Sequence, residues 1–296
     1  MSIFRGAGVA LITPFNSDNS VNFSELERMI EDQVSNGTDA IIVCGTTGEP
    51  ATMTEDEKLS VIRCAVEKVD GRIPVIAGTG ANSTQTVIDF SKKVENLGVD
   101  GLLIVTPFYN KATQKGLYAH YSTIANAINL PIIMYNVPSR TGCNLLPETA
   151  VSLAEDFPNI VGIKEASGNI TQIVKLAQLS QGILDIYSGN DDQIVPILSL
   201  GGVGVISVLS NVAPKDTHDM VMKYLEGNIK RALELQLKYV DLVDALFCEV
   251  NPIPVKSAMN MIGYEAGGLR LPLTELEIEH KAKLQDELRK VGLVKE

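Results

Sequence analysis

Apolar and polar positions follow two alternating patterns along the chain. Short runs rich in β-branched residues, which are typical of strands, alternate with longer segments in which apolar residues recur at helical spacing. This order is typical of βα units with a parallel sheet. The runs that suit strands number eight: 8–13, 40–44, 74–78, 101–106, 131–135, 160–164, 183–188 and 204–208. The pattern predicts an α/β fold, a (β/α)8 TIM barrel.

Local signals mark the starts of several helices. Ser24 with Glu27, and Thr54 with Glu57, match the capping box, in which a hydroxyl and a later glutamate each accept from a free backbone amide. The first helix is predicted to run to Gly37. Its predicted buried stripe is Leu26, Met29, Ile30 and Val34, and that of the second helix is Leu59, Ile62, Ala65, Val66 and Val69. Further helix starts are predicted at Asn82 or Ser83, at Pro147 and after Asn169.

The strand pattern ends near residue 208, and only helical patterns follow, at 214–226, 230–247, 254–261 and 275–291. The first of these helices would complete the eighth βα unit. We therefore predict two regions, a barrel carrying the active site at 1–226 and a C-terminal three-helix region at 227–296. The join has no Ser/Gly/Pro-rich linker, so we expect the two regions to pack tightly.

Charge and hydropathy argue against nucleic-acid and membrane partners. The 296-residue chain has a formal net charge of -11, whereas nucleic-acid and anionic membrane surfaces need clustered positive charge. No stretch approaches the ~18 apolar residues of a membrane span. The first fifteen residues hold one arginine and a short apolar run broken by Pro14, unlike a signal peptide. We expect a cytoplasmic enzyme of small molecules, with no nucleic-acid or membrane partner.

The metal-binding and disulfide-forming residues are scattered. The four cysteines lack the close pairs of zinc sites and are too sparse for a disulfide scaffold. The three histidines, His120, His218 and His280, show no ligand spacing. We therefore expect a reducing compartment, no metal and no cofactor.

Lys164 ends one of the apolar strand runs. Strand alternation places it on the same face as Gly162, which leaves room beside it, and opposite Ile163. An ammonium on an apolar strand loses hydration, which lowers its pKa and favours the neutral amine, a nucleophile able to form a Schiff base with a carbonyl. The alternative is an edge-strand lysine that prevents aggregation. This stretch alone leaves both interpretations open.

Other polar residues follow the predicted strands, and a barrel would bring all of them to one rim. Thr46 and Thr47 could hold a small carboxylate or form an ordinary turn, and Tyr109 and Tyr135 could relay protons or serve the core. Arg140 could clamp a carboxylate or simply be solvated. The glycine-rich segment 201–204 lacks a following lysine and is interpreted as a tight turn. Convergence on one rim around a lysine favours an enzyme.

Four motifs resemble those of the class I pyruvate aldolases, in particular the dihydrodipicolinate synthase family. They match in order and spacing over essentially the full length: Gly45-Thr46-Thr47-Gly48-Glu49, Tyr135-Asn136-Val137-Pro138, Arg140-Thr141-Gly142 and Gly162-Ile163-Lys164-Glu165-Ala166. The related sugar-acid lyases resemble a Gly-Ser-Thr-Gly-Glu pattern and lack the arginine. Arg140 therefore distinguishes the two groups.

The resemblance implies a lyase that condenses pyruvate with L-aspartate 4-semialdehyde in diaminopimelate and lysine biosynthesis. Lys164 would form the Schiff base, which becomes an enamine, attacks the aldehyde and cyclises with loss of water. Tyr135 would donate and accept protons, with Thr46 and Tyr109 completing its relay. Thr47 and the backbone at Ile206 would bind pyruvate, and Arg140 would hold the carboxylate of the semialdehyde.

The resemblance also implies an assembly and a regulatory property. Tyr109 would come from a neighbouring subunit, so a homodimer would be the minimal active unit and a homotetramer, a dimer of dimers, the usual form. Members inhibited by L-lysine tend to carry histidine, glutamate and tyrosine where this chain has Lys58, Thr86 and Phe108. We therefore expect insensitivity to L-lysine. Two other functions remain open, a Schiff-base lyase of keto sugar acids and a barrel that binds a keto acid without turnover.

Overall fold

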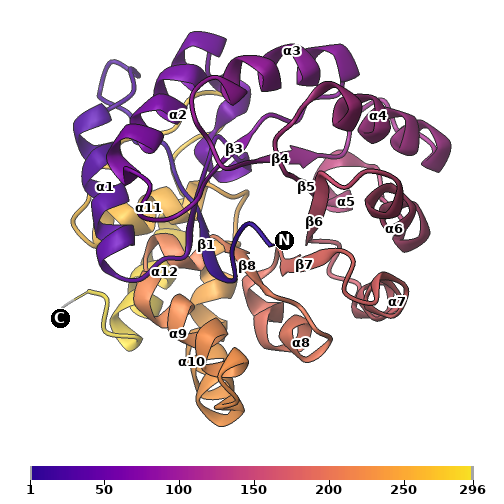
Figure 1. Ribbon diagram of the computed structural model, residues 1–296. Coiled ribbons are helices and arrows are strands. Elements are labelled where there is room, and N and C mark those ends of the chain that lie inside the picture. Colours follow the sequence, from indigo (N-terminus) through magenta and orange to yellow (C-terminus); the bar gives the residue numbers. More distant parts are fainter. Residues whose placement is uncertain (1, 295–296) are drawn as a thin grey trace.

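Eight parallel strands close into one barrel in the computed structural model, which describes residues 2–294. The strand order is sequential, each strand pairing with the next and β8 pairing back with β1. Helices form a ring outside the strands (Figure 1). The strands are β1 (Gly6–Ala10), β2 (Ala40–Val43), β3 (Val75–Gly78), β4 (Gly101–Val105), β5 (Ile132–Asn136), β6 (Ile160–Glu165), β7 (Asp185–Ser188) and β8 (Gly204–Ser207). The predicted TIM barrel is confirmed.

The helices of the outer ring follow the strands in order. They are α1 (Phe23–Ser35), α2 (Glu55–Val69), α3 (Thr84–Glu95), α4 (Gln114–Ala127), α5 (Pro138–Thr141), α6 (Pro147–Asp156), α7 (Ile170–Ser180), α8 (Ile194–Ser199) and α9 (Pro214–Leu225). Four 3₁₀ turns lie beside them: η1 (Thr46–Gly48), η2 (Pro50–Thr52), η3 (Asp191–Gln193) and η4 (Leu209–Asn211). Three helices come after the barrel: α10 (Ile229–Leu246), α11 (Ile253–Met261) and α12 (Ile278–Lys290).

Two separate apolar clusters fill the molecule. The larger lies between the strands and the surrounding helices. The smaller fills the barrel interior and includes Ile42, Leu103, Ile133, Tyr187 and Ile206. Because both faces of the strands are covered, their sequences are apolar nearly throughout, which is the pattern that predicted them.

The observed helix N-termini agree with some of the predicted caps and differ from one of them. Thr54 and Glu57 form the predicted capping box, with the Thr54 hydroxyl accepting from the Glu57 amide and the Glu57 carboxylate accepting from the Thr54 amide. The box predicted at Ser24 is wrong, since the side chain of Asn22 accepts from the amide of Glu25 and the helix starts at Phe23. Both residue types cap well, and the chain adopts its turn two residues earlier than the motif suggested. Caps at Ser83 and Asn169 are as predicted.

Some boundaries and buried positions differ from the prediction. The first strand is Gly6–Ala10 rather than 8–13, because residues 11–13 leave the sheet as the start of the loop to α1. Val34, Leu59 and Val66 are only partly buried, whereas Gln33 and Val61 are buried. Residues 201–203 of the segment 201–204 lie in the predicted turn, which leads from α8 into β8, and Gly204 is the first residue of β8.

The C-terminal helices pack against the barrel without an extended linker. α10 lies alongside α9, and α12 packs on both α10 and α11 (Figure 1). The outermost positions of the two predicted regions, residues 1, 295 and 296, lie outside the described residues. Among residues 2–294, no helix is long and apolar enough to cross a membrane.

Candidate active site

Lys164 lies on β6 and faces the interior of the barrel. Its backbone pairs with Tyr135 on β5 and with Tyr187 on β7, and only 6% of its surface is exposed. Since the barrel is closed, β6 is not an edge strand, and the interpretation of Lys164 as an aggregation-blocking edge residue is wrong. The space beside Gly162 is occupied, because a Cβ atom there would lie 3.1 Å from the Tyr187 ring.

Burial raises the free energy of the charged form of Lys164, because the ammonium loses its hydration. Loss of hydration lowers its pKa from 10.5 to about 8, an effect opposed by the carboxylate of Asp191 and reinforced by the positive charge of Arg140. The Nζ atom lies 4.5 Å from the centroid of the Tyr135 ring. At pH 7 roughly one-tenth of such a group is the neutral amine, a far larger fraction than for an exposed lysine.

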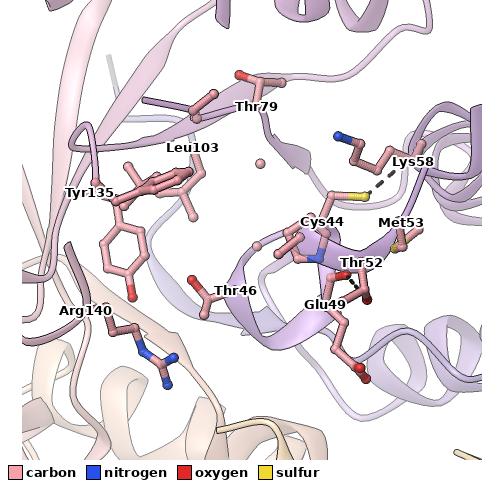
Figure 2. Close-up of a pocket in the computed structure, with 18 of the residues that line it drawn as sticks. Cys44, Thr46, Glu49, Thr52, Met53, Lys58, Thr79, Leu103, Tyr135 and Arg140 are labelled. Atoms are coloured by element: carbon pink, nitrogen blue, oxygen red, sulfur yellow. Dashed lines mark hydrogen bonds between the residues drawn. The ribbon is translucent and has the colours of Figure 1, made fainter. Parts of the chain in front are cut away.

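Tyr135 extends from β5 into the cavity above Lys164. Burial raises the pKa of its phenol, while the charge of Arg140 and the hydroxyl of Thr46 act in the opposite direction. The phenol oxygen points toward Thr46 and Arg140 (Figure 2). The phenol therefore keeps its proton at neutral pH and lies beside two polar groups that could exchange or orient it.

The Thr46–Thr47 pair lies on the 3₁₀ turn η1 that follows β2. The backbone carbonyl of Gly48, in the same turn, accepts a hydrogen bond from the Thr13 hydroxyl at 2.7 Å. The next residue, Glu49, has a left-handed backbone conformation with a φ of 55°. Thr46 lines the cavity, whereas Thr47 is 2% exposed and its hydroxyl accepts from the side-chain amide of Asn251 at 3.0 Å. The two threonines therefore have different surroundings.

Arg140 lies on the short helix α5, which the sequence patterns did not predict. Its Nη2 donates to the backbone carbonyl of Asn251 at 3.1 Å, and the side chain otherwise lines the cavity opposite Thr46 (Figure 2). One contact to a carbonyl leaves most of the five donors of the guanidinium free. The group can therefore bind an anion in the cavity.

The remaining two candidate residues lie outside the cavity wall. Tyr109 is 89% exposed, with a φ of 75°, and its backbone amide donates to the carbonyl of Thr141 at 3.2 Å. Ile206 lies on β8, paired with Gly8 and fully buried in the barrel. Within this chain Tyr109 is therefore open to solvent and does not line the cavity.

A cavity of about 560 Å³ opens at the carboxyl ends of the strands. Its lining includes Leu103, Tyr135 and Arg140, and also Lys58, Thr86 and Phe108. Of the seven candidate residues, Thr46, Tyr135 and Arg140 line it directly. Lys164 is not one of the lining residues, but its Nζ lies over the ring of Tyr135, which does line the cavity.

Known proteins resemble this chain over its whole length. The model of the dihydrodipicolinate synthetase family matches residues 3–291. The chain belongs to the dihydrodipicolinate synthetase family. This match confirms the resemblance to the dihydrodipicolinate synthase family that was inferred from the sequence motifs.

Individual members of the dihydrodipicolinate synthetase family agree with this assignment. The 4-hydroxy-tetrahydrodipicolinate synthase of Lachnoclostridium phytofermentans is 57% identical over 294 residues, covering 99% of this chain and all of the relative. The crystal structure of the dihydrodipicolinate synthase of Thermotoga maritima has a TM-score of 0.97 at 45% identity, covering 99% of this chain and 100% of that chain. A monomeric dihydrodipicolinate synthase variant has the same TM-score and identity, covering 99% of this chain and 98% of that chain.

Sequence reasoning did not single out three groups that this family member places near the site. Asn251 contacts both Thr47 and Arg140, Asp191 acts electrostatically on Lys164, and Lys256 lies behind the Thr46–Thr47 turn. Asp191 follows a predicted strand and could have been suspected on that basis. Asn251 and Lys256 lie in the C-terminal region, where no local signal links them to the barrel rim.

Proposed function

We propose that the chain condenses pyruvate with L-aspartate 4-semialdehyde to give 4-hydroxy-tetrahydrodipicolinate, within diaminopimelate and lysine biosynthesis. The observation that carries the proposal is Lys164, a buried amine inside a closed barrel with its pKa lowered to about 8. The name of the relative from Lachnoclostridium phytofermentans supports the identity of the product.

The chemistry begins at Lys164. Its neutral amine attacks the ketone carbon of pyruvate, and loss of water gives an iminium, whose positive charge makes the methyl protons acidic. Removal of one proton gives an enamine, which attacks the aldehyde carbon of the semialdehyde. The amino group of that substrate then attacks the iminium carbon and displaces Lys164, closing the ring. One water is lost in the whole reaction.

Proton transfers are assigned to Tyr135, with Thr46 beside it and Tyr109 completing the relay. The orientation of the Tyr135 hydroxyl toward Thr46 supports this role (Figure 2). Thr47 and the backbone at Ile206 are assigned to the pyruvate carboxylate. Arg140, whose guanidinium faces the cavity, is assigned to the carboxylate of the semialdehyde.

We propose a homotetramer, a dimer of dimers, as the working assembly. Tyr109 is too exposed to complete the relay of its own chain, which supports its use by a second copy. A separate stripe on α10, formed by Ile229, Leu233, Leu237 and Val240, is also exposed, and its spacing places it on one helix face. A variant that stays monomeric and folded is expected to lose turnover, and an active monomer would contradict the role of Tyr109.

We propose that L-lysine does not inhibit this enzyme. Lys58, Thr86 and Phe108 line the cavity on the side away from Arg140, and Lys58 Nζ lies 4.9 Å from the centroid of the Phe90 ring. A fixed ammonium at this place repels the ammonium groups of lysine. Unchanged rates at millimolar L-lysine are expected, and complete inhibition there would refute the proposal.

We also propose that the enzyme works in the cytoplasm. Within each subunit, we propose that the barrel (1–226) and the C-terminal region (227–296) build the site together. Its four cysteines are free, which suits a reducing compartment. Side chains of the C-terminal region contact the Thr46–Thr47 turn, so the two regions depend on each other at the site.

The decisive experiment measures product formation from pyruvate and L-aspartate 4-semialdehyde, coupled to the next reductase, for the wild type and Lys164→Ala. Turnover by the wild type alone is expected. Borohydride with pyruvate is expected to leave an irreversible adduct on Lys164, detected by mass spectrometry. An adduct without turnover would favour a keto sugar-acid lyase, and no adduct would favour a barrel that binds a keto acid without chemistry.

A further inference from the structure

Asn251 joins two of the proposed substrate-binding residues. Its side-chain Nδ2 donates to the Thr47 hydroxyl at 3.0 Å, and its backbone carbonyl accepts from Arg140 Nη2 at 3.1 Å. The residue lines the cavity although only 5% of its surface is exposed. Asn251 therefore lies in the cavity wall between the group assigned to pyruvate and the group assigned to the second substrate.

The remaining polar atom of this side chain has no partner. Four buried side-chain atoms in residues 2–294 lack a hydrogen bond: His120 Nε2, Asp191 Oδ1, Gln193 Oε1 and Asn251 Oδ1. Of these four residues, only Asn251 lines the cavity. A buried acceptor left unpaired destabilises the protein, so an unpaired acceptor on a residue that lines the cavity indicates a ligand that donates to it.

We propose that Asn251 Oδ1 binds the α-ammonium group of the aldehyde substrate, an inference that rests on the proposed function. Pyruvate offers no donor, whereas the ammonium of L-aspartate 4-semialdehyde offers three. An α-amino acid carries its carboxylate and ammonium on one carbon. Arg140 and Asn251 are in contact, so a carboxylate at Arg140 places the ammonium beside Asn251.

A neutral acceptor suits the later chemistry. The amino group must lose a proton before it can attack the iminium carbon and close the ring. A carboxylate at position 251 would bind the ammonium more strongly but would also raise its pKa and hold that proton. An amide carbonyl selects the amino group and still allows it to become a nucleophile.

The test compares L-aspartate 4-semialdehyde with 4-oxobutanoate, which is the same molecule without the amino group. The KM for the semialdehyde and the competitive inhibition constant for 4-oxobutanoate are measured for wild type, Asn251→Ala and Asn251→Asp. Asn251→Ala is expected to raise the KM about ten- to a hundredfold, as for loss of a hydrogen bond to a charged group. The inhibition constant for 4-oxobutanoate is expected to change much less. Asn251→Asp is expected to lower the ratio of KM to inhibition constant and to lower kcat.

Two controls separate selectivity from general disturbance. Both aldehydes meet the same enamine formed from pyruvate on Lys164, so damage to Thr47 or Arg140 affects them alike and cancels in the ratio. Asn260→Ala removes an exposed asparagine of the same region, which donates to the carbonyl of Gly267, and is expected to leave the ratio unchanged.

The outcomes distinguish a failure of this inference from a failure of the proposed function on which it rests. Equal losses for the two aldehydes in Asn251→Ala would overturn it and leave Asn251 as a residue that only positions Thr47 and Arg140. No turnover of the semialdehyde by the wild type would instead overturn the proposed function, and the inference with it. A selective loss in Asn251→Ala, with the borohydride adduct of pyruvate retained on Lys164, would support both.

Discussion

The ammonium of Lys256 donates a hydrogen bond to Glu49 Oε1 at 2.8 Å, and both side chains are only 1% exposed. Glu49 follows the turn that carries Thr46 and Thr47, and its second oxygen accepts from the backbone amide of Arg270 at 3.3 Å. Lys256 and Arg270 both lie over the ring of Phe15, at 4.1 and 4.3 Å from its centroid. The C-terminal region thus holds the Thr46–Thr47 turn of the barrel through one buried carboxylate.

Breaking this ion pair is expected to destabilise the protein strongly. Lys256→Met leaves the Glu49 carboxylate buried without its cation, which typically costs about 3–5 kcal/mol. Urea unfolding, followed by circular dichroism, measures the change. The double variant Glu49→Gln/Lys256→Met is expected to recover much of the loss, because no charge is then left buried. Equal stability of the single and double variants would show that the unpaired Glu49 carboxylate is not the source of the loss.

Glu57 is expected to give stability that depends on pH. Hydrogen bonds from Arg270 lower the pKa of its carboxyl from 4.5 to about 2. A carboxylate with a lowered pKa stabilises the fold above its unfolded value, and this contribution is lost as the pH falls from about 4.5 toward 2. Glu57→Gln is therefore expected to be less stable than wild type at pH 7 and to approach it in acid. Glu67→Gln, an exposed site on the same helix, serves as the control. A gap that is constant with pH would contradict the prediction.

Removing the charge of Lys164 is expected to stabilise the fold while abolishing the chemistry. Its folded pKa of about 8 lies below the ordinary 10.5, so at pH 7 the folded state carries a poorly hydrated ammonium. Lys164→Met is expected to raise the free energy of unfolding by up to about 3 kcal/mol. The advantage should shrink between pH 8 and 10.5, where the unfolded wild type binds more protons than the folded state. A less stable Met variant at pH 7 would contradict this account.

Two neighbouring charges are expected to shift the pH dependence of Schiff-base formation in opposite directions. Arg140 lowers the pKa of Lys164 and Asp191 raises it. In Arg140→Leu the rising limb of the rate should therefore move to higher pH, and in Asp191→Asn to lower pH. The measurement is the initial rate of borohydride-trapped pyruvate adduct between pH 6 and 10. Shifts of the same sign in both variants would exclude the electrostatic explanation.

The sequence predicted the strands and several helix starts because both are local. Eight apolar runs, separated by segments of helical period, match the eight strands to within a few residues. The first strand was placed about two residues late because residues 11–13 remain apolar after the chain leaves the sheet. The helix start near Ser24 was misplaced because Asn22 and Ser24 can both cap, and only the path of the preceding loop chooses between them.

The candidate site was predictable in part. Strand alternation placed Lys164 on the same strand face as Gly162, and the ends of strands pointed to Thr46, Tyr135 and Arg140. The same sequence could not decide whether Lys164 lies on an edge strand, because closure of the sheet depends on the pairing of β1 with β8, about 200 residues apart. Closure removes every edge and buries the amine.

By itself, then, the sequence determined the order of elements and the parallel barrel, since periodicity is carried by neighbouring residues. Only the tertiary structure decided which C-terminal residues reach the site. Asn251 meets Thr47 across 204 positions of chain, and Lys256 meets Glu49 across 207. Such contacts follow from how α11 packs on the finished barrel, and no short-range pattern in the chain records that geometry.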